Sequence, residues 1–290
     1  MEHRINGHTR LFCLIGSPVG HSGSPAMYNY SFDKLGLDNA YLAFDIPLEK
    51  TGEAVQALKL MHVGGFNVTM PCKTAVTDFV DEVSPAAQMI GACNTITVSE
   101  SGRLTGHNTD GIGFVRNLEK HGVSVKGKKL VVLGAGGAAT AVTIQSALEG
   151  AAKISIFNRK GFNFYEKGEH TVETVKAKLP ECDISIHNLF DDRLLAEAVK
   201  DCDILINATK VGMAPLDKET LINPALFRPE MVVADTVYNP RETRMIREAK
   251  AAGCTVVGGI GMLLQQGVAA FKLFTGEQMP EEEVMQKFFS

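Results

Sequence analysis

The sequence predicts an α/β protein with two domains, an N-terminal α/β domain and a doubly wound Rossmann domain. Short apolar runs alternate with longer helical segments along almost the whole chain of 290 residues, which is typical of mostly parallel sheets flanked by helices. A cluster of glycines directly follows one of the apolar runs near the middle of the chain. The length suffices for two domains of about 150 residues each.

In the first half, apolar runs predict strands and the stretches between them predict helices. Strands are expected at 11–15, 41–46 and 66–70, and helices at about 25–35 and through Val55 and Leu58. The run 95–106 predicts a hairpin around Ser101-Gly102, and 110–119 predicts a helix.

The second half predicts six strands and the helices that connect them. The strands are expected at 130–133, 154–157, 184–187, 204–207, 232–235 and 255–257, and the helices at 138–149, about 172–179 and 194–199. This order indicates a doubly wound sheet, which binds nucleotides at its topological switch point. Two final helices, at 262–274 and 281–289, are expected to return to the first domain. We therefore predict a substrate domain of residues 1–121 completed by 262–290, and a cofactor domain of residues 122–261.

Composition excludes several classes of function. The 29 Lys and Arg residues against 33 Asp and Glu residues give a formal charge of −4, so neither nucleic acid nor an anionic membrane is an expected partner. The six cysteines lie far apart, without the spacing of a metal site or a disulfide framework. No apolar stretch is long enough for a signal sequence or a membrane span. We expect a cytoplasmic protein without a metal.

The glycine cluster lies in the run L-G-A-G-G-A-A, which begins at the end of the strand at 130–133. Gly134, Gly136 and Gly137 have no Cβ, so a pyrophosphate can approach the backbone at the start of the next helix. Tight strand-to-helix turns also use glycine for purely steric reasons. Because this cluster opens a strand–helix–strand unit, we expect it to bind a nucleotide cofactor.

The next strand ends in Asn158, Arg159 and Lys160 instead of an acidic residue. An acidic side chain at this point holds the ribose hydroxyls of NAD, whereas adjacent cations suit the 2′-phosphate of NADP. Alternatively, Arg159 stacks on the adenine and Lys160 is solvated. The predicted cofactor is NAD or NADP, with use of both.

Oxidation of an alcohol releases a proton as well as a hydride, so the first domain must supply an acid–base group. Lys73 in N-V-T-M-P-C-K and Asp110 in H-N-T-D-G are candidates, together with the polar groups of Asn94 and Ser24. Each also has a structural explanation. Ser24 and Asp110 can cap helices, Lys73 can be a solvated surface cation, and Asn94 can satisfy a turn.

A set of short motifs occurs in order along the chain: H-S-x-S-P, N-V-T-x-P-x-K, G-A-x-N-T, N-T-D-G, G-A-G-G-A, N-R, N-A-T-x-x-G-M, V-Y-N-P and G-x-G-M-L-x-x-Q. Through them the chain resembles the shikimate and quinate dehydrogenase family over nearly its whole length. The resemblance is closest to the branch that accepts both substrates and both cofactors, through L-G-A-G-G-A-A-T-A, F-N-R-K, T-K-V-G-M and G-M-L-L-x-Q-G.

The resemblance implies a role for each motif. Lys73 and Asp110 would form the catalytic pair, and Ser22 and Ser24 would hold the substrate carboxylate. The substrate ring would be surrounded by Asn67, Thr69, Asn94, Tyr238 and Gln266. The cofactor would contact Gly134, Ala135, Gly136, Gly137, Ala138, Asn158, Arg159, Lys160, Lys210, Val237, Tyr238, Asn239 and Gly259. Some relatives that use both cofactors carry an acidic residue where this chain has Gly161, which puts the grip on the adenosine ribose in doubt.

The implied activity is the reversible NAD(P)-dependent oxidation of shikimate to 3-dehydroshikimate, and of quinate to 3-dehydroquinate, in aromatic amino-acid biosynthesis or quinate use. The alternative is a catalytically silent sensor of shikimate or quinate with the same fold. A one-carbon folate enzyme on the same two-domain plan is disfavoured, because the serine-rich motif would then have no purpose. The oligomeric state expected is a monomer or a homodimer.

Overall fold

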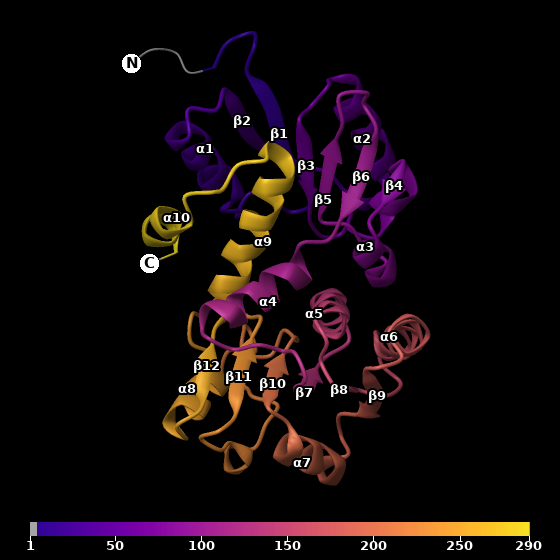
Figure 1. Ribbon diagram of the computed structural model, residues 1–290, viewed down its shortest axis with the longest axis vertical. Coiled ribbons are helices and arrows are strands. Elements are labelled where there is room, and N and C mark those ends of the chain that lie inside the picture. Colours follow the sequence, from indigo (N-terminus) through magenta and orange to yellow (C-terminus); the bar gives the residue numbers. More distant parts are fainter. Residues whose placement is uncertain (1–4, 290) are drawn as a thin grey trace. The chain divides into compact units, whose positions relative to one another are not determined.

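The computed structural model describes residues 5–289, which form two six-stranded sheets flanked by helices (Figure 1). Contacts divide the chain into two compact units. The first comprises the chain up to Thr109 together with the chain from Gly267 onward, and the second is Asp110–Gln266. The sequence predicts a second domain of residues 122–261, whereas the observed second unit is Asp110–Gln266. The predicted and observed boundaries therefore differ mainly by the helix that starts at Asp110. That helix groups with the second unit because Gly111 packs closely on the backbone of Ala141.

The sheet of the first unit has the strand order β2-β1-β3-β5-β6-β4. Its strands are β1 Arg10–Gly16, β2 Asn39–Asp45, β3 Gly65–Val68, β4 Glu82–Val83, β5 Thr95–Val98 and β6 Leu104–His107. Strands β1, β2 and β3 are parallel, and β5 and β6 form the antiparallel hairpin that the sequence predicts. The helical segments are α1 Ser24–Lys34, η1 Leu48–Lys50, α2 Thr51–Leu60, η2 Ala75–Phe79 and α3 Pro85–Ile90.

Two C-terminal helices, α9 Gly259–Thr275 and α10 Glu281–Phe288, complete the first unit from Gly267 onward. Phe271 of α9 lies with its ring centroid 6.0 Å from that of Tyr28 and 5.5 Å from that of Phe32. Glu283 of α10 accepts a hydrogen bond of 2.6 Å from the Tyr30 hydroxyl. These contacts confirm the expected return of the C-terminal helices to the first unit.

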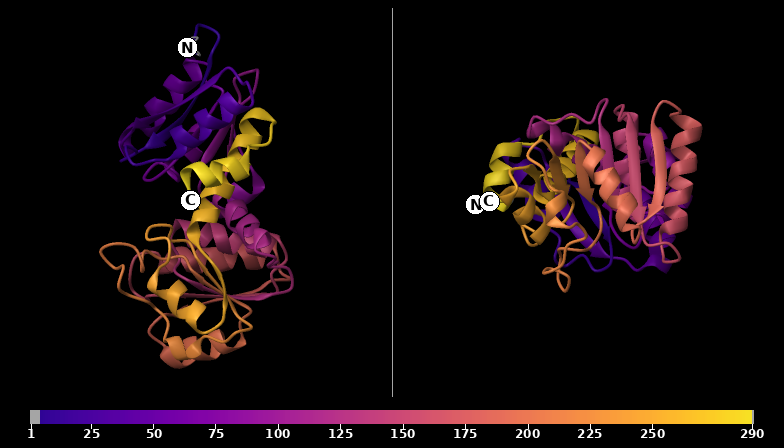
Figure 2. Two further views of the ribbon diagram at one scale, coloured as in Figure 1. Left: turned by 90° about the vertical axis from the view of Figure 1, so that its left-hand side faces the viewer. Right: turned by 90° about the horizontal axis from the view of Figure 1, so that it is seen from below.

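The sheet of the second unit is entirely parallel, with the strand order β12-β11-β10-β7-β8-β9. Its strands are β7 Lys129–Leu133, β8 Lys153–Asn158, β9 Asp183–Asn188, β10 Ile204–Asn207, β11 Val232–Asp235 and β12 Thr255–Val257. Helices cover both faces of this sheet (Figures 1 and 2). They are α4 Asp110–Lys120, α5 Gly137–Leu148, α6 Tyr165–Lys178, α7 Asp192–Asp201, η3 Pro224–Leu226 and α8 Arg244–Ala251. The predicted doubly wound sheet is confirmed, and its switch point lies between β7 and β10.

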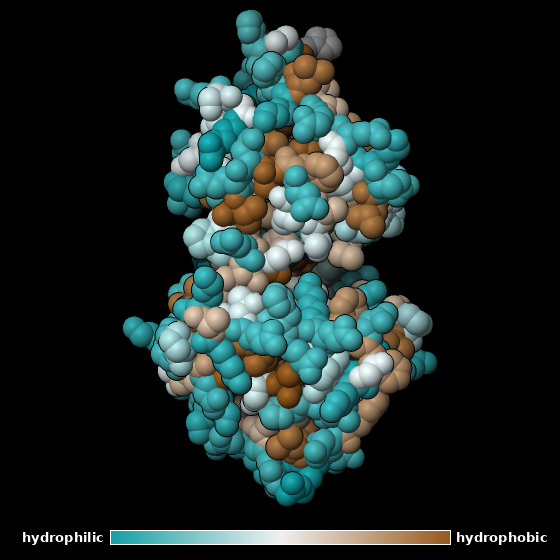
Figure 3. Space-filling model, turned by 90° about the vertical axis from the view of Figure 1, so that its right-hand side faces the viewer, coloured by the Kyte–Doolittle hydropathy of each residue, from teal (hydrophilic) through white to brown (hydrophobic). Residues whose placement is uncertain are grey.

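Apolar side chains fill both units. One cluster, which includes Val131, Leu205 and Val233, packs beneath α7 and α8, and another, which includes Cys13, Phe66 and Ile96, lies in the first unit. The face in Figure 3 is mostly hydrophilic, and its apolar side chains lie in small separate groups, as is usual for a folded protein. Within residues 5–289, no helix is both long enough and apolar enough to cross a membrane.

Candidate functional site

A chain of buried hydrogen bonds runs through the first unit and includes two residues predicted to surround the substrate ring. The Tyr41 hydroxyl donates to Asn67 Oδ1 at 2.7 Å. Asn67 Nδ2 in turn donates to Thr95 Oγ1 at 3.0 Å and to the carbonyl of Asn94 at 3.2 Å. Because buried polar groups are costly unless they are paired, this network fixes the carboxyl end of β3 against the start of β5.

Asn94 connects this network to the segments that carry the predicted catalytic pair. Its Oδ1 accepts a hydrogen bond of 2.8 Å from the backbone of Thr109, and its Nδ2 donates to Thr109 Oγ1 at 3.0 Å. The neighbouring residue Cys93 donates its backbone N–H to the carbonyl of Lys73 at 2.9 Å. The backbone of Lys73 and that of Thr109, which directly precedes Asp110, are therefore bonded to adjacent residues of one segment.

The predicted catalytic residues lie outside the regular sheet. Lys73 is in the turn between β3 and η2, and Asp110 is the first residue of α4, in the second unit. Both residues are partly exposed. The nearby His107 is bonded to Thr97 at 3.2 Å, and burial lowers its pKa, so the imidazole of His107 is neutral at neutral pH.

The predicted carboxylate ligands Ser22 and Ser24 lie at the start of α1. Ser22 Oγ accepts a hydrogen bond of 3.2 Å from the backbone N–H of Ser24. Gly23 occupies the N-cap position and Ser24 is the first helical residue. The alternative that Ser24 caps this helix is therefore wrong.

Thr69, which is predicted to contact the substrate ring, directly follows β3. Its backbone N–H donates to the carbonyl of Ile15 in β1 at 2.9 Å.

In the second unit, the glycine turn between β7 and α5 contains glycines in two different environments. Gly134 has φ +107°, and a Cβ there would lie 2.9 Å from the carbonyl oxygen of Ala208, so only glycine fits. Gly136 is the N-cap of α5 and Gly137 its first residue, and a Cβ on either would meet nothing within 4 Å. The turn therefore leaves open space at a helix N-terminus, where backbone N–H groups favour an anion.

The end of β8 carries the residues predicted to hold the adenosine. Asn158 Nδ2 is buried, and no described residue pairs with it. The Arg159 guanidinium lies 4.9 Å from the ring centroid of Phe162, and Lys160 is exposed. An unpaired buried donor beside an open glycine turn fits a polar ligand such as a dinucleotide.

The remaining predicted cofactor residues lie after β10, after β11 and at the start of α9. Lys210 is exposed and Val237 is buried, while Tyr238 is 42% exposed. Gly259 is required for close packing, because a Cβ there would lie 2.5 Å from the carbonyl oxygen of Val237. Gln266 Nε2 donates to the Leu263 carbonyl at 2.9 Å.

Three residues support these loops although the sequence predicts no role for their side chains: Asn207, Asp235 and Thr243. Asn207 and Asp235 are the last residues of neighbouring strands, and Asn207 donates to Asp235 at 2.9 Å. A polar residue at the end of an otherwise apolar strand is the signal that could have identified both. In the first unit, the sequence predicts no role for Tyr41 or Thr95. Both are bonded to Asn67, which is 26 residues from Tyr41 and 28 residues from Thr95 in the sequence, so no local pattern connects them.

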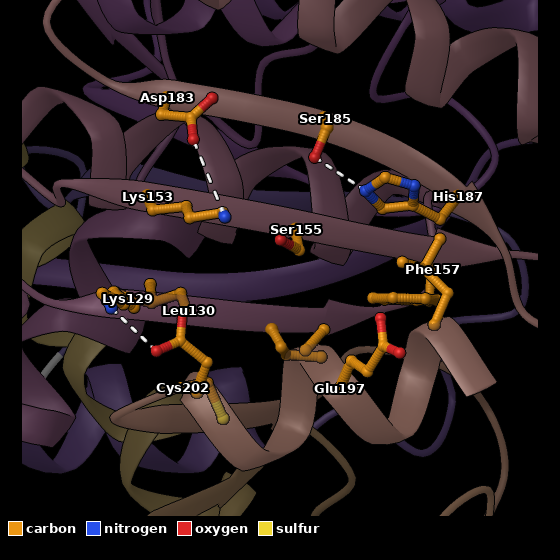
Figure 4. A pocket seen from close by; sticks show the side chains of 14 residues that line it. Lys129, Leu130, Lys153, Ser155, Phe157, Asp183, Ser185, His187, Glu197 and Cys202 are labelled. Carbon is orange, nitrogen blue, oxygen red and sulfur yellow. Dashed lines mark hydrogen bonds and ion pairs between the residues drawn. The ribbon is translucent and has the colours of Figure 1, made fainter. Parts of the chain in front are cut away.

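A groove on one face of the second sheet lies beside α7 and is lined by alternate residues of β8 and β9 (Figure 4). In it, Lys153 pairs with Asp183 at 3.8 Å, and Ser185 Oγ lies 2.8 Å from His187 Nε2. Burial lowers the pKa of His187, as does the neighbouring Lys153. The groove contains none of the predicted site residues, and within residues 5–289 no group of His, Cys, Asp and Glu is arranged to hold a metal.

The chain is similar to known proteins over its full length. The shikimate dehydrogenase substrate binding domain matches residues 14–96, and the shikimate 5′-dehydrogenase C-terminal domain matches residues 259–287. A shikimate dehydrogenase (NADP(+)) of Listeria monocytogenes is 44% identical over 290 residues, which cover 100% of this chain and 99% of that protein.

Solved structures agree with these similarities. The shikimate 5-dehydrogenase of Listeria monocytogenes in complex with shikimate and NAD has a TM-score of 0.97 at 43% identity, covering 100% of this chain and 99% of that one. The quinate dehydrogenase of Corynebacterium glutamicum in complex with NAD has a TM-score of 0.86 at 28% identity, covering 97% of this chain and 98% of that one.

Proposed function

The chain belongs to the shikimate dehydrogenase family, and we propose that it catalyses the reversible NADP-dependent oxidation of shikimate to 3-dehydroshikimate. The observation that supports this proposal most directly is the pair of bonds that Cys93 makes to Lys73 and Asn94 makes to Thr109. They tie the two segments that bear the acid–base candidates to one rigid buried network.

In the proposed reaction, the O–H proton of the ring carbinol passes to Nζ of Lys73, and the carboxylate of Asp110 stabilises the resulting ammonium. A bound nicotinamide dinucleotide supplies the acceptor for the hydride released from the same carbon. In the reverse direction, the Lys73 ammonium polarises the ketone and returns the proton to its oxygen. Such acid–base assistance typically contributes about 10²- to 10⁴-fold to a rate.

We assign substrate binding to the residues that the family motifs indicate. Ser22 and Ser24 hold the carboxylate, and the ring hydroxyls contact Asn67, Thr69, Asn94, Tyr238 and Gln266. The network that holds Asn67 and Asn94 keeps their amides in place before the substrate arrives. Preorganised polar groups of this kind reduce the entropic cost of positioning a substrate.

The cofactor is held by the second unit. The open N-terminus of α5 suits a pyrophosphate, and the unpaired Nδ2 of Asn158 suits a ribose oxygen. Arg159 and Lys160 suit the 2′-phosphate of NADP, because Gly161 follows them where an acidic residue would repel it. We assign the remaining cofactor contacts to Lys210, Val237, Tyr238, Asn239 and Gly259.

Two finer properties belong to the same proposal. NAD is a second, weaker cofactor, because it lacks the 2′-phosphate that Arg159 and Lys160 suit, and quinate is a second substrate. Both reactions use soluble metabolites, which fits a cytoplasmic enzyme. Size-exclusion chromatography with light scattering distinguishes a monomer from a homodimer.

A kinetic grid of shikimate and quinate with NADP⁺ and NAD⁺ tests this proposal. We expect reduced nicotinamide to form in all four combinations, with the highest kcat/KM for shikimate with NADP⁺. Tight binding of shikimate without formation of reduced nicotinamide would contradict the proposal and would favour the silent sensor.

A further inference from the structure

Asp235 is a buried carboxylate at the carboxyl end of β11 and is only 2% exposed. Its Oδ1 accepts hydrogen bonds of 2.9 Å from Asn207 Nδ2 and from the backbone N–H of Val237, and its Oδ2 accepts one of 2.6 Å from Thr243 Oγ1. A buried carboxylate is costly unless donors surround it. Three donors from three different segments here converge on one side chain.

The first of these segments follows β10, the strand beside β11 (Figure 1). Asn207 Oδ1 accepts hydrogen bonds from Thr209 N at 3.1 Å and from Thr209 Oγ1 at 2.7 Å. Asn207 Nδ2 donates to the Val211 carbonyl at 2.9 Å, and Thr209 Oγ1 accepts from the Val211 backbone at 3.0 Å. Lys210 lies between these two anchored residues, so the network fixes its backbone on both sides.

The other two segments lie at the ends of the loop that follows β11. Val237, at its start, is bonded directly to Asp235. Thr243, at its end, also caps α8, because its Oγ1 accepts from the Ile246 N–H at 3.3 Å. The carboxylate therefore joins both ends of the loop that carries Tyr238 and Asn239.

We propose that Asp235 is a positioning residue that holds the loops after β10 and β11 in the conformation that binds the nicotinamide dinucleotide. It acts through Lys210 and the segment Val237–Asn239, and the assignment of those residues to the cofactor rests on the proposed function. Asp235 itself is only 2% exposed, so we assign it no contact with the reacting atoms.

The surroundings of Asp235 favour this role over an ion pair. Its three partners are neutral, and the charged side chains of α8 pair with one another or with Glu242: Arg244 with Glu248 at 2.6 Å, and Lys250 with Glu242 at 3.0 Å. Burial raises the pKa of Asp235 to about 6, and the three hydrogen bonds oppose that shift. Above this pH the side chain accepts from all three donors, which an asparagine, with one oxygen and one NH₂ group, cannot do.

The test compares the NADP⁺ dissociation constant, measured by calorimetry at pH 7.5, between the wild-type chain and four variants. Asp235→Asn and Thr243→Val remove parts of the network, Thr243→Ser keeps the hydroxyl, and Val199→Ala creates a cavity in the core of the same unit, away from the network. Thermal midpoints report the stability of each variant, and steady-state kinetics report KM for each substrate.

We expect Asp235→Asn and Thr243→Val to raise the NADP⁺ dissociation constant about tenfold, the effect of one buried hydrogen bond. Thr243→Ser stays within about twofold of the wild type. Val199→Ala lowers the thermal midpoint without weakening NADP⁺ binding.

The outcomes separate the two proposals. If the wild-type chain does not bind NADP⁺, the proposed function fails and the positioning role fails with it. If the wild type binds but Asp235→Asn and Thr243→Val bind equally well, only the positioning role is refuted. A Val199→Ala variant that loses NADP⁺ affinity as strongly would also refute it. Should Asp235→Asn not fold, the contrast between Thr243→Val and Thr243→Ser decides.

Discussion

Replacing Tyr41 with phenylalanine removes one hydroxyl from the buried network of the first unit. Tyr41 is fully buried, and its hydroxyl donates to Asn67 Oδ1 at 2.7 Å. The phenylalanine ring fills nearly the same space, so the main change is an Asn67 oxygen that loses its donor. An unsatisfied buried polar atom costs about 1–3 kcal/mol. We therefore expect Tyr41→Phe to lower the free energy of unfolding by that amount.

The same change should reach the chemistry, because Asn67 is proposed to contact the substrate ring. If the amide shifts to find another partner, the loss of about 1–3 kcal/mol in the transition state corresponds to a fall of about 5- to 150-fold in kcat/KM for shikimate. KM for NADP⁺ should stay the same, because the cofactor residues lie in the second unit. Initial rates of NADPH formation, measured by absorbance, give both quantities.

Tyr30→Phe is the matched control for this measurement. Its hydroxyl donates to Glu283 at 2.6 Å, in the same unit but between α1 and α10. We expect it to change stability without changing kcat/KM. If Tyr41→Phe keeps kcat/KM within twofold of the wild type, or if Tyr30→Phe lowers it equally, the network does not position the substrate.

Three further predictions concern the second unit. Asp235 has a pKa raised from 3.8 to about 6, so the folded chain holds a proton that the unfolded chain lacks between about pH 4 and pH 6, and this stabilisation is lost as pH rises. Denaturant unfolding should show that the free energy of unfolding of Asp235→Asn gains on the order of 3 kcal/mol relative to that of the wild type as pH rises through that range. A difference in unfolding free energy that stays constant with pH would refute the assignment. Gly259→Ala should weaken NADP⁺ binding in calorimetry, because its Cβ would lie 2.5 Å from the Val237 carbonyl oxygen, and unchanged affinity would show that this loop does not contact the cofactor. Arg159→Gln should raise the NADP⁺ dissociation constant about tenfold by removing a charge-assisted bond to the 2′-phosphate while leaving that for NAD⁺ within twofold, and an equal loss for both would assign Arg159 to the adenine instead.

The sequence predicts the sheets well because buried parallel strands appear as short apolar runs separated by helices. The elements that it does not predict are short or atypical. Strand β4 has two residues and α3 has six, too few for a periodic pattern. Helix α8 is also short, because its eight residues make only about two turns, and its amphipathic pattern is not among the predicted helices. Helix α6 begins at Tyr165, whereas the sequence predicts a start at about Val172. Its first two turns are polar and include Gly168, so they lack the apolar pattern of a helix. Gly168 is nevertheless accommodated there, because it packs against Ile186 of β9.

The candidate site is predictable at the level of motifs, since its residues follow strands at the carboxyl ends of the sheets. What holds those residues in place is not predictable in the same way. Tyr41 meets Asn67 only because β1 lies between β2 and β3 in the sheet. Asp235 meets Asn207 because β10 and β11 pair in one register. Such contacts depend on strand order, which the local sequence pattern does not specify.

The most direct test of the proposed activity is the rate of NADPH formation from shikimate and NADP⁺ by Lys73→Ala. Removing the amine takes away the proposed proton acceptor at the ring hydroxyl. We predict that kcat falls about 10²-fold or more, while calorimetry gives an unchanged NADP⁺ dissociation constant. Turnover close to that of the wild type would show that Lys73 does not handle the proton and would contradict the mechanism.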